Sequence, residues 1–348
     1  MKHGMKAGRQ RVTLRSLAEQ LNVHVSTVSR VLNGTPEEAR SAASPEVIQS
    51  IRELAERLNY RPNPQATGLR TRRTRMIGVL VPRLSDIVVA MIYEGIDEAA
   101  KDNRYVTFVS STLDNPARQV QLGEAMLDHN VEGLIIGDTR VDTTEYIEKL
   151  TRRGLPLVLV SRHAPGYCCV TCDDYKGGQL AAEHLISLGH RHIAILAGES
   201  FASNAIDRTN GFLHYCEDHG ISIRKEWVIH TSFDTKSGRL GSDALLSSSE
   251  KPTAIFAVND FLAIGLMGAL RDHGIRPGEG IAIVGFNDTP LSAELPISLT
   301  SVRSDMRRMG YRGMELLIEK LNGNTPESEF IEPTLQIRAS SQPGAQRG

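Results

Sequence analysis

The chain has 348 residues, of which 40% are hydrophobic and 23% are charged, and its formal net charge is −1. This length and composition predict two or three globular domains and exclude a disordered or collagen-like chain. The charge is unevenly distributed: residues 1–75 contain 14 Lys and Arg, 6 Glu and no Asp, whereas the remainder carries 26 basic and 35 acidic residues. A basic head on an acidic body indicates a nucleic-acid-binding module joined to a part with another partner.

No apolar run is long enough to span a membrane, and no apolar signal core follows the basic N-terminus. We therefore expect a cytoplasmic, nucleoid-associated protein with no membrane partner. Cys169 and Cys172 have the spacing of a metal or redox pair, but they lie in an apolar, strand-like run without a second pair or a nearby His. We expect buried, reduced cysteines, no metal and no other cofactor.

The N-terminal segment predicts two short helices joined by a tight turn. Thr13 is a suitable N-cap for a helix over residues 14–21, which has its apolar residues on one side. Residues 22–24 form the turn, and the second helix contains the string Ser26-Thr27-Val28-Ser29-Arg30-Val31-Leu32-Asn33. This arrangement is typical of a helix-turn-helix, in which the second helix enters the major groove of DNA.

The second helix divides into two faces at about 100° per residue. Its valines and leucine share one arc, whereas the opposite arc carries Ser26, Ser29, Arg30 and Asn33 and no acid. Hydroxyls, an amide and a guanidinium suit base edges and phosphates, and no carboxylate repels the DNA backbone. By itself this string fits an ordinary surface helix; the preceding helix favours the DNA-reading interpretation.

A third helix is predicted to begin after the N-cap Ser44 and to run to about residue 58, and residues 34–43 are predicted to form a polar, alanine-rich loop. Beyond it, Asn63 can cap a short helix that ends near Arg70. So short a helix forms only against a partner. Leu69, surrounded by Arg, suits a wedge in a minor-groove base step; the alternative is a basic linker.

From Met76 onward, apolar strands alternate with helical stretches, which predicts βαβ units around parallel sheets covered on both faces. About 270 residues predict two doubly wound lobes, with a ligand in the crevice at the carboxyl ends of the strands. The predicted strands are residues 77–81, 106–110, 133–136, 157–160, 192–196, 254–258 and 281–285.

Residues 23–33, followed by Tyr60-x-Pro62-Asn63-x-x-Ala66-x-x-Leu69, resemble the lactose-repressor (LacI/GalR) family of bacterial transcription regulators. Further matching strings are residues 188–193, Arg208-x-x-Gly211-Phe212, and residues 258–260, 284–288 and 299–302, so the resemblance covers nearly the whole chain. Two departures are His24, where a Ser is usual, and a longer segment between Asn33 and Tyr60. The DNA-contacting residues that the resemblance implies are Val25, Ser26, Thr27, Ser29, Arg30, Asn33, Asn63, Ala66 and Leu69.

The resemblance also implies a periplasmic-binding-protein-like effector domain with an effector held between two subdomains. Arg208 and Asp260 are expected to act as a pair across the cleft; the alternative for them is an interdomain salt bridge. Phe233 is expected to stack on the ligand, with plain core packing as the alternative. The other effector-binding residues are Asp86, Ser161 and Asn287. The usual Asn-Pro-Phe-Phe is Asp86-Ile87-Val88-Val89 here, and the loss of two rings weakens the expectation of a flat nucleobase. An Arg–Asp pair can donate to and accept from hydroxyl groups, which favours a sugar or polyol.

The predicted fold is an all-α helix-turn-helix headpiece plus an α/β effector domain of two doubly wound parallel-sheet subdomains. The predicted domains are a headpiece at 1–60, a hinge helix and linker at 61–75, and an effector-binding and dimerisation domain at 76–348. Its N-subdomain is expected at about 76–172 and 303–334, and its C-subdomain at about 173–302 and 335–348.

The predicted function is a sequence-specific transcription regulator, most simply a repressor, that binds a pseudo-palindromic operator as a homodimer, with a tetramer as the other possible assembly. Hydrolase, phosphate-loop and metalloprotease motifs are absent from the sequence, so no enzymatic activity is expected. Two alternatives remain: control by a protein coregulator, or a cytosolic small-molecule-binding protein whose head makes protein contacts. The sequence leaves open the effector, the operator, and whether the effector induces or corepresses.

Overall fold

The computed structural model describes residues 12–60 and 73–342. The predicted hinge contacts Asn63, Ala66 and Leu69 lie outside these residues. The chain divides into two compact units, residues 1–74 and 75–348, which we call the head and the body. Within the described residues, no helix is long and apolar enough to cross a membrane.

Within residues 12–60, the head contains four helices around one small core. Leu17, Val28 and Ile51 are fully buried at its centre, as the apolar arcs predict. Thr13 caps the first helix through a reciprocal bond pair with Ser16. The helices are α1 (Leu14–Leu21), α2 (Val25–Asn33), α3 (Pro36–Ala42) and α4 (Pro45–Arg57).

The prediction of a loop over residues 34–43 is wrong, because this segment contains α3. Thr35 and Glu38 form a capping box at its start, and Pro36 occupies the first turn. Ala39 is buried in the head core, which ties the segment to the other helices. Ser44 stands at the N-cap of α4 as predicted, but its hydroxyl makes no bond to the helix backbone.

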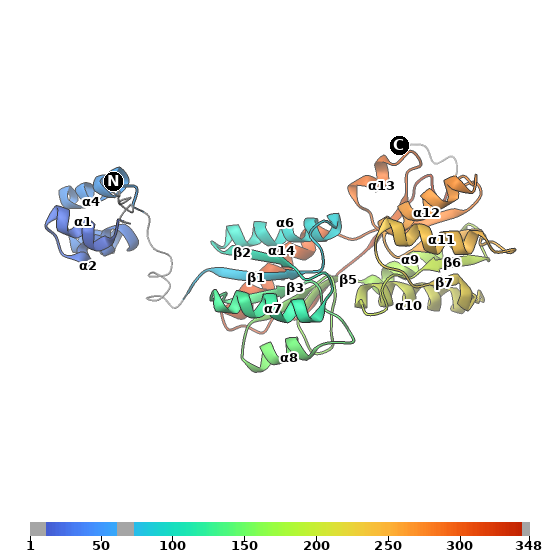
Figure 1. Cartoon of the computed structure of the whole chain (residues 1–348), viewed down its shortest axis with the longest axis horizontal. Coiled ribbons are helices and arrows are strands. Elements are labelled where there is room, and N and C mark those ends of the chain that lie inside the picture. The colour runs from blue at the N-terminus through green and yellow to red at the C-terminus, as the bar shows by residue number, and fades with distance from the viewer. Residues whose placement is uncertain (1–11, 61–72, 343–348) are drawn as a thin grey trace, which may run out of the picture. The chain divides into compact units, whose positions relative to one another are not determined.

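In the described part of the body, residues 75–342, there are two six-stranded sheets, each the centre of one lobe. In the first lobe the strand order is β11-β5-β4-β3-β1-β2, and all pairs are parallel. Figure 1 shows α6 and α14 on one face of this sheet and α7 and α8 on the other. The strands are β1 (Met76–Val81), β2 (Val106–Ser111), β3 (Gly133–Ile136), β4 (Leu157–Val160), β5 (Cys169–Cys172) and β11 (Glu329–Ile331). The helices are α6 (Ile87–Asp102), α7 (Pro116–Asp128), α8 (Glu145–Arg152) and α14 (Met306–Leu321).

In the second lobe the strand order is β12-β10-β9-β8-β6-β7, and only the edge pair of β10 and β12 is antiparallel. Helices again cover both faces (Figure 1). The strands are β6 (Ile193–Leu196), β7 (Val228–Ile229), β8 (Ala254–Ala257), β9 (Ala282–Asn287), β10 (Thr300–Arg303) and β12 (Thr334–Gln336). The helices are α9 (Asp174–Ser187), α10 (Ser203–Asp218), α11 (Thr235–Leu246), α12 (Asp260–Asp272), α13 (Pro290–Glu294) and a 3-10 turn, η1 (Lys225–Trp227).

The seven predicted strands are all present, with ends shifted by no more than two residues. Within residues 73–342 the chain crosses between the lobes three times: after β5, after β10 and after β11. The first lobe is therefore completed by α14 and β11, which come after every strand of the second lobe except β12. Gly310 of α14 packs so closely on α6 that an added Cβ would overlap the carbonyl oxygen of Ile92.

The cysteines of β5 are buried, as the sequence predicts. Burial raises the pKa of the Cys172 thiol to about 12, so this thiol stays protonated at neutral pH. Within the described residues, no group of three or more His, Cys, Asp and Glu is arranged to hold a metal ion.

Candidate functional site

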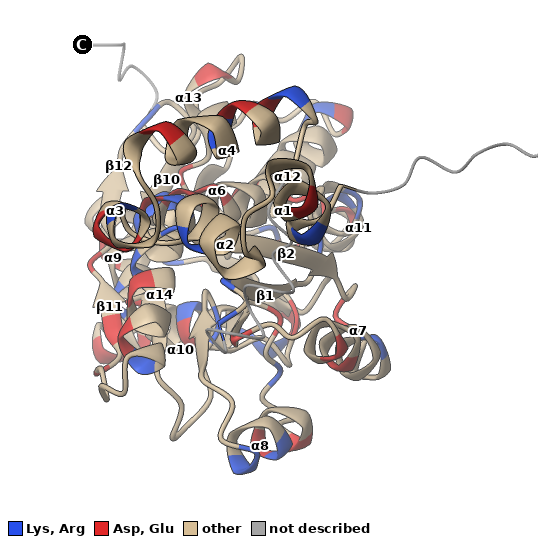
Figure 2. Ribbon diagram, turned by 90° about the vertical axis from the view of Figure 1, so that its left-hand side faces the viewer, with Lys and Arg blue, Asp and Glu red and all other residues tan. Residues whose placement is uncertain are grey.

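Helix α2 presents a polar face without any acidic residue (Figure 2). Val28 and Val31 are buried beneath it, whereas Val25, Ser26 and Arg30 are exposed. The remaining predicted contacts, Thr27, Ser29 and Asn33, are half-buried. The exposed Ser26 and Arg30 lie in the polar arc as predicted, whereas Val25, which the arcs group with the buried valines, is exposed. Hydroxyl and guanidinium groups are types of side chain that can bond to base edges.

His24 caps α2 in place of the usual hydroxyl residue. Its Nδ1 accepts a bond from the backbone N–H of Ser26 at 3.3 Å and lies 2.7 Å from the Ser26 Oγ. A ring nitrogen can thus satisfy one of the unpaired N–H groups at the start of the helix. This cap also fixes the Ser26 side chain at the end of the helix that would face DNA.

A cleft lies between the two lobes of the body. Its inner cavity has a volume of about 60 Å³, and its outer part, which we call the outer cleft, has a volume of about 600 Å³. The two are adjacent, because residues that include Asp86, Arg162 and Phe233 line both. The inner lining comes mainly from residues at the carboxyl ends of strands, where doubly wound sheets bind ligands. Of the predicted effector residues, five line the inner cavity: Asp86, Ser161, Arg208, Phe233 and Asn287.

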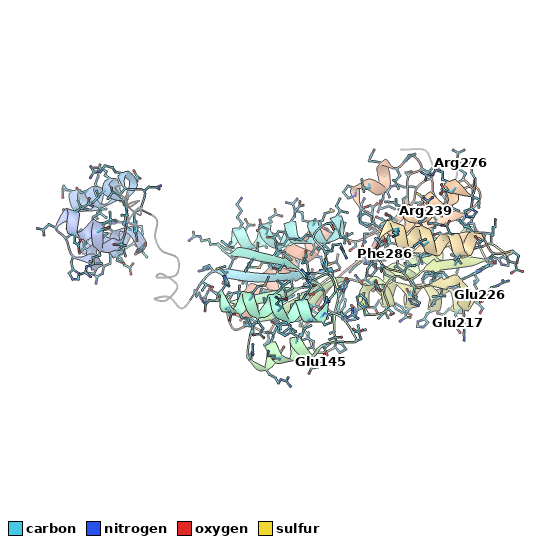
Figure 3. The ribbon with its side chains drawn as sticks, in the orientation of Figure 1. Glu145, Glu217, Glu226, Arg239, Arg276 and Phe286 are labelled. Atoms are coloured by element: carbon cyan, nitrogen blue, oxygen red, sulfur yellow. The ribbon has the colours of Figure 1, made fainter. Side chains whose placement is uncertain are left out.

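Arg208 on α10 is held from three directions. Its Nε donates to Asp174 Oδ1 at 2.7 Å, and its Nη1 donates to the carbonyl of Val258 at 2.7 Å. Its guanidinium also lies 3.7 Å from the ring centre of Phe286, which Figure 3 labels. Nη2 takes part in neither bond, so the side chain is fixed while one end can serve a ligand.

Asp174 is a buried carboxylate with one oxygen free of partners within the described residues. Burial raises the pKa of Asp174 to about 6, and the Arg208 guanidinium opposes that rise. At pH 7 and above, Asp174 is therefore mainly ionised and compensates the charge of Arg208.

The expected pair of Arg208 and Asp260 across the cleft is wrong: the partner of Arg208 is Asp174. Asp260 is buried, and its carboxylate accepts bonds from the Thr289 N–H and from two serine hydroxyls, those of Ser292 and Ser301. These bonds fix the loop after β9, which begins at Asp288 and so directly follows Asn287 at the end of the strand. The neighbouring Asn259 lines the cavity instead, because consecutive residues at a helix start point in different directions.

Arg162 is a cleft residue that the site prediction omitted. It is almost completely buried, and its Nη1 donates to Asp114 Oδ1 at 2.6 Å. Ser161 beside it has a φ of 65°, a left-handed conformation that is uncommon for serine. This backbone turn places consecutive side chains of the loop after β4 in the cleft lining.

The outer cleft is lined by the rings of Phe201, Phe233 and Phe261 and by several charged groups. The Arg140 guanidinium lies 3.6 Å from the ring centre of Phe201, and the backbone N–H of Val141 donates to the Phe201 carbonyl at 3.0 Å. These contacts join the loop after β3 in the first lobe to the loop after β6 in the second.

Comparisons with known proteins bear on both units. Residues 182–341 match a family model described as a periplasmic binding protein-like domain. Catabolite control protein A of Priestia megaterium is 31% identical over 324 residues, which cover 92% of this chain and 96% of that protein. The chain belongs to the lactose-repressor (LacI/GalR) family.

Two solved structures of transcription regulators are similar over nearly the whole chain. The lac repressor dimer bound to operator and the anti-inducer ONPF has a TM-score of 0.88 at 25% identity, covering 96% of this chain and 100% of that one. The CelR–cellobiose complex has a TM-score of 0.72 at 25% identity, covering 95% of this chain and 100% of that one. The protein is therefore a DNA-binding transcription regulator with a small-molecule effector domain.

In this LacI/GalR regulator, the sequence prediction missed several residues that line the cleft. The missed residues of the inner cavity include Arg162, Asn204 and Asn259. Each of these residues follows a predicted strand or the loop after it. Their position near the carboxyl ends of strands could therefore have predicted that they line the cleft. Asp114 and Asp174 also follow strands, β2 and β5, but this position alone does not show which arginine each carboxylate binds.

Proposed function

We propose that the protein is a repressor that binds a pseudo-palindromic operator as a homodimer and responds to a sugar or polyol in the interlobe cleft. The lining of the cleft supports this proposal, because Arg208 is held there in a fixed position and the same cavity is lined by the amides of three asparagines, Asn204, Asn259 and Asn287. Each amide can donate and accept hydrogen bonds, as hydroxyl groups require. The cellobiose bound by CelR is one example of such a ligand in a related fold.

In this proposal residues 1–60 form the DNA-reading headpiece, residues 61–75 the hinge, and residues 76–348 the effector and dimerisation domain of a cytoplasmic regulator. The exposed side chains of α2 read base edges, and Leu69 wedges a minor-groove step at the centre of the operator. The effector favours one arrangement of the lobes, and its differential affinity for two states changes the affinity for DNA.

Selection of bound duplexes from a random library, followed by titration at several salt concentrations, tests the DNA-binding part. A defined consensus with two related half-sites and a steep loss of affinity with salt is expected. Leu69→Ala should lower operator affinity without changing the melting temperature of the body. Unchanged affinity would remove the wedge from the proposal.

Thermal-shift screening against sugars, polyols, their phosphate esters and nucleosides tests the effector part, because a ligand of the folded state raises the melting temperature. Hits are then tested for a change in operator affinity. A stabilising compound that leaves operator binding unchanged would contradict effector control. Control by a protein coregulator predicts that no compound of these classes changes operator binding.

A further inference from the structure

Two guanidiniums line the inner cavity, and each is already paired with its own carboxylate. Arg208 is bound to Asp174 at 2.7 Å, and Arg162 to Asp114 at 2.6 Å. The arginine side chains are only 6% and 4% exposed. Buried charges of this kind are stable only when they are paired, so these carboxylates are built-in counterions.

Asp86 is the one acidic residue among the described residues that line the inner cavity, and it adds a third carboxylate to the two that pair with Arg162 and Arg208. Burial raises the pKa of Asp86, with Arg162 and Arg208 opposing the rise. Two guanidiniums therefore face three carboxylates, which gives a local charge of −1 with Asp86 ionised and 0 with Asp86 protonated.

The outer cleft repeats this balance. The Arg140 guanidinium donates two hydrogen bonds to the Asp142 carboxylate, with N–O distances of 2.7 and 2.9 Å. The same guanidinium also lies over the ring of Phe201. The acidic residues that line the outer cleft are Asp86, Asp114, Glu199 and Asp234, whereas Arg83 is a further, solvent-exposed cation. Like the inner cavity, the outer cleft thus carries no excess of positive charge.

We propose that this cleft takes a neutral polyhydroxy ligand and discriminates against phosphate esters and carboxylates. The proposal rests on the proposed function, in which the cleft is the effector site. An anion entering the inner cavity would meet two arginines that already have counterions, and it would lose hydration without gaining an unpaired positive charge. A neutral ligand can instead bond to the amides and to the free end of Arg208.

The test uses inorganic phosphate as the probe and the full-length protein at about pH 7.5, where Asp174 is mainly ionised. Asp114→Asn keeps an oxygen near Arg162 but removes the counterion charge. Its backbone φ of 55° is a conformation that Asn adopts readily. The reference is the double variant Asp114→Asn/Arg162→Gln, which lacks both charges.

Melting temperatures are measured over a phosphate titration against chloride at equal ionic strength. Phosphate stabilises folded proteins in general and also meets the basic head, so only differences between variants report on the cleft. We expect the melting temperature of wild type to rise with phosphate by the same amount as that of the double variant. The melting temperature of Asp114→Asn should show a further, saturable rise of about 3 °C.

A saturable rise in wild type above the double variant would overturn the proposal, since the cleft would then already bind an anion. The absence of any gain in Asp114→Asn would also overturn it, because Asp114 would not be what excludes anions. Should Asp114→Asn fail to fold, Asp174→Asn with Asp174→Asn/Arg208→Gln as reference makes the same comparison at the other pair. Failure of operator binding would refute the proposed function, but it would leave this measure of cleft charge intact.

Discussion

The imidazole of His163 meets the carboxylate of Asp207 between the two lobes, with Nε2 and Oδ2 2.6 Å apart. His163 follows β4 in the first lobe, and its backbone N–H donates to Ser203 Oγ on α10 at 2.8 Å. The hydrogen bond to Asp207 raises the pKa of His163 against the effect of burial, and the Asp174 carboxylate adds to the rise. Because Asp207 adjoins Arg208, one turn of α10 carries both an interlobe contact and the cleft guanidinium.

This pair predicts a pH-dependent contact between the lobes. A raised His pKa means that its stabilising contribution is complete below the ordinary imidazole pKa of about 6.5 and is lost as pH rises through the raised value. The melting temperature of wild type, relative to His163→Gln, should therefore fall from about pH 5.5 to about pH 8.5. Parallel profiles for the two proteins would show that the pair adds no pH-dependent stability.

Arg30→Ala should weaken binding to the selected operator by roughly 1–3 kcal/mol, because the exposed guanidinium of α2 can bond to a base edge in two places. Fluorescence anisotropy with operator and random duplexes measures the loss. An equal loss on both duplexes would assign Arg30 to a phosphate contact instead.

Arg208→Gln should abolish the response to an effector while operator binding persists. The single substitution leaves Asp174 buried without its partner, which costs about 3–5 kcal/mol. The double variant Asp174→Asn/Arg208→Gln removes that unpaired charge and should recover much of the stability without the response. Melting curves measure the loss of stability, and operator titrations with a screened ligand measure the loss of the effector response. A normal response in the double variant would show that Arg208 has only a structural role.

Gly310→Ala should destabilise the body by about 1–3 kcal/mol, because its Cβ would overlap the Ile92 carbonyl where α14 crosses α6. Gly268→Ala on α12 is the matched control, since its Cβ would meet only the movable end of the Arg239 side chain. Urea unfolding should show the control unchanged or more stable, as Ala favours a helix. Equal destabilisation by both would contradict a specific close approach at Gly310.

The elements with strong periodicity were predictable, as the arcs of α2 and the apolar strands show. α3 was missed although Thr35-Pro36-Glu37-Glu38 is a helix-start pattern, because an alanine-rich heptapeptide has little apolar stripe. In the cleft, the position of Arg208 followed from the sequence, but its partner Asp174 lies 34 residues away. Pairings over such distances depend on the folded arrangement of helices, which periodicity does not specify.

The return of the chain to its first lobe has a consequence for synthesis. Until α14 and β11 leave the ribosome, β5 has an unpaired edge and α6 lacks the helix that packs on it. The first lobe thus remains incomplete while all of the second lobe except β12 and the C-terminal segment is synthesised, and its exposed edge favours aggregation. A message truncated before about residue 306 should yield a polypeptide whose N-terminal lobe is degraded rather than a stable half-protein.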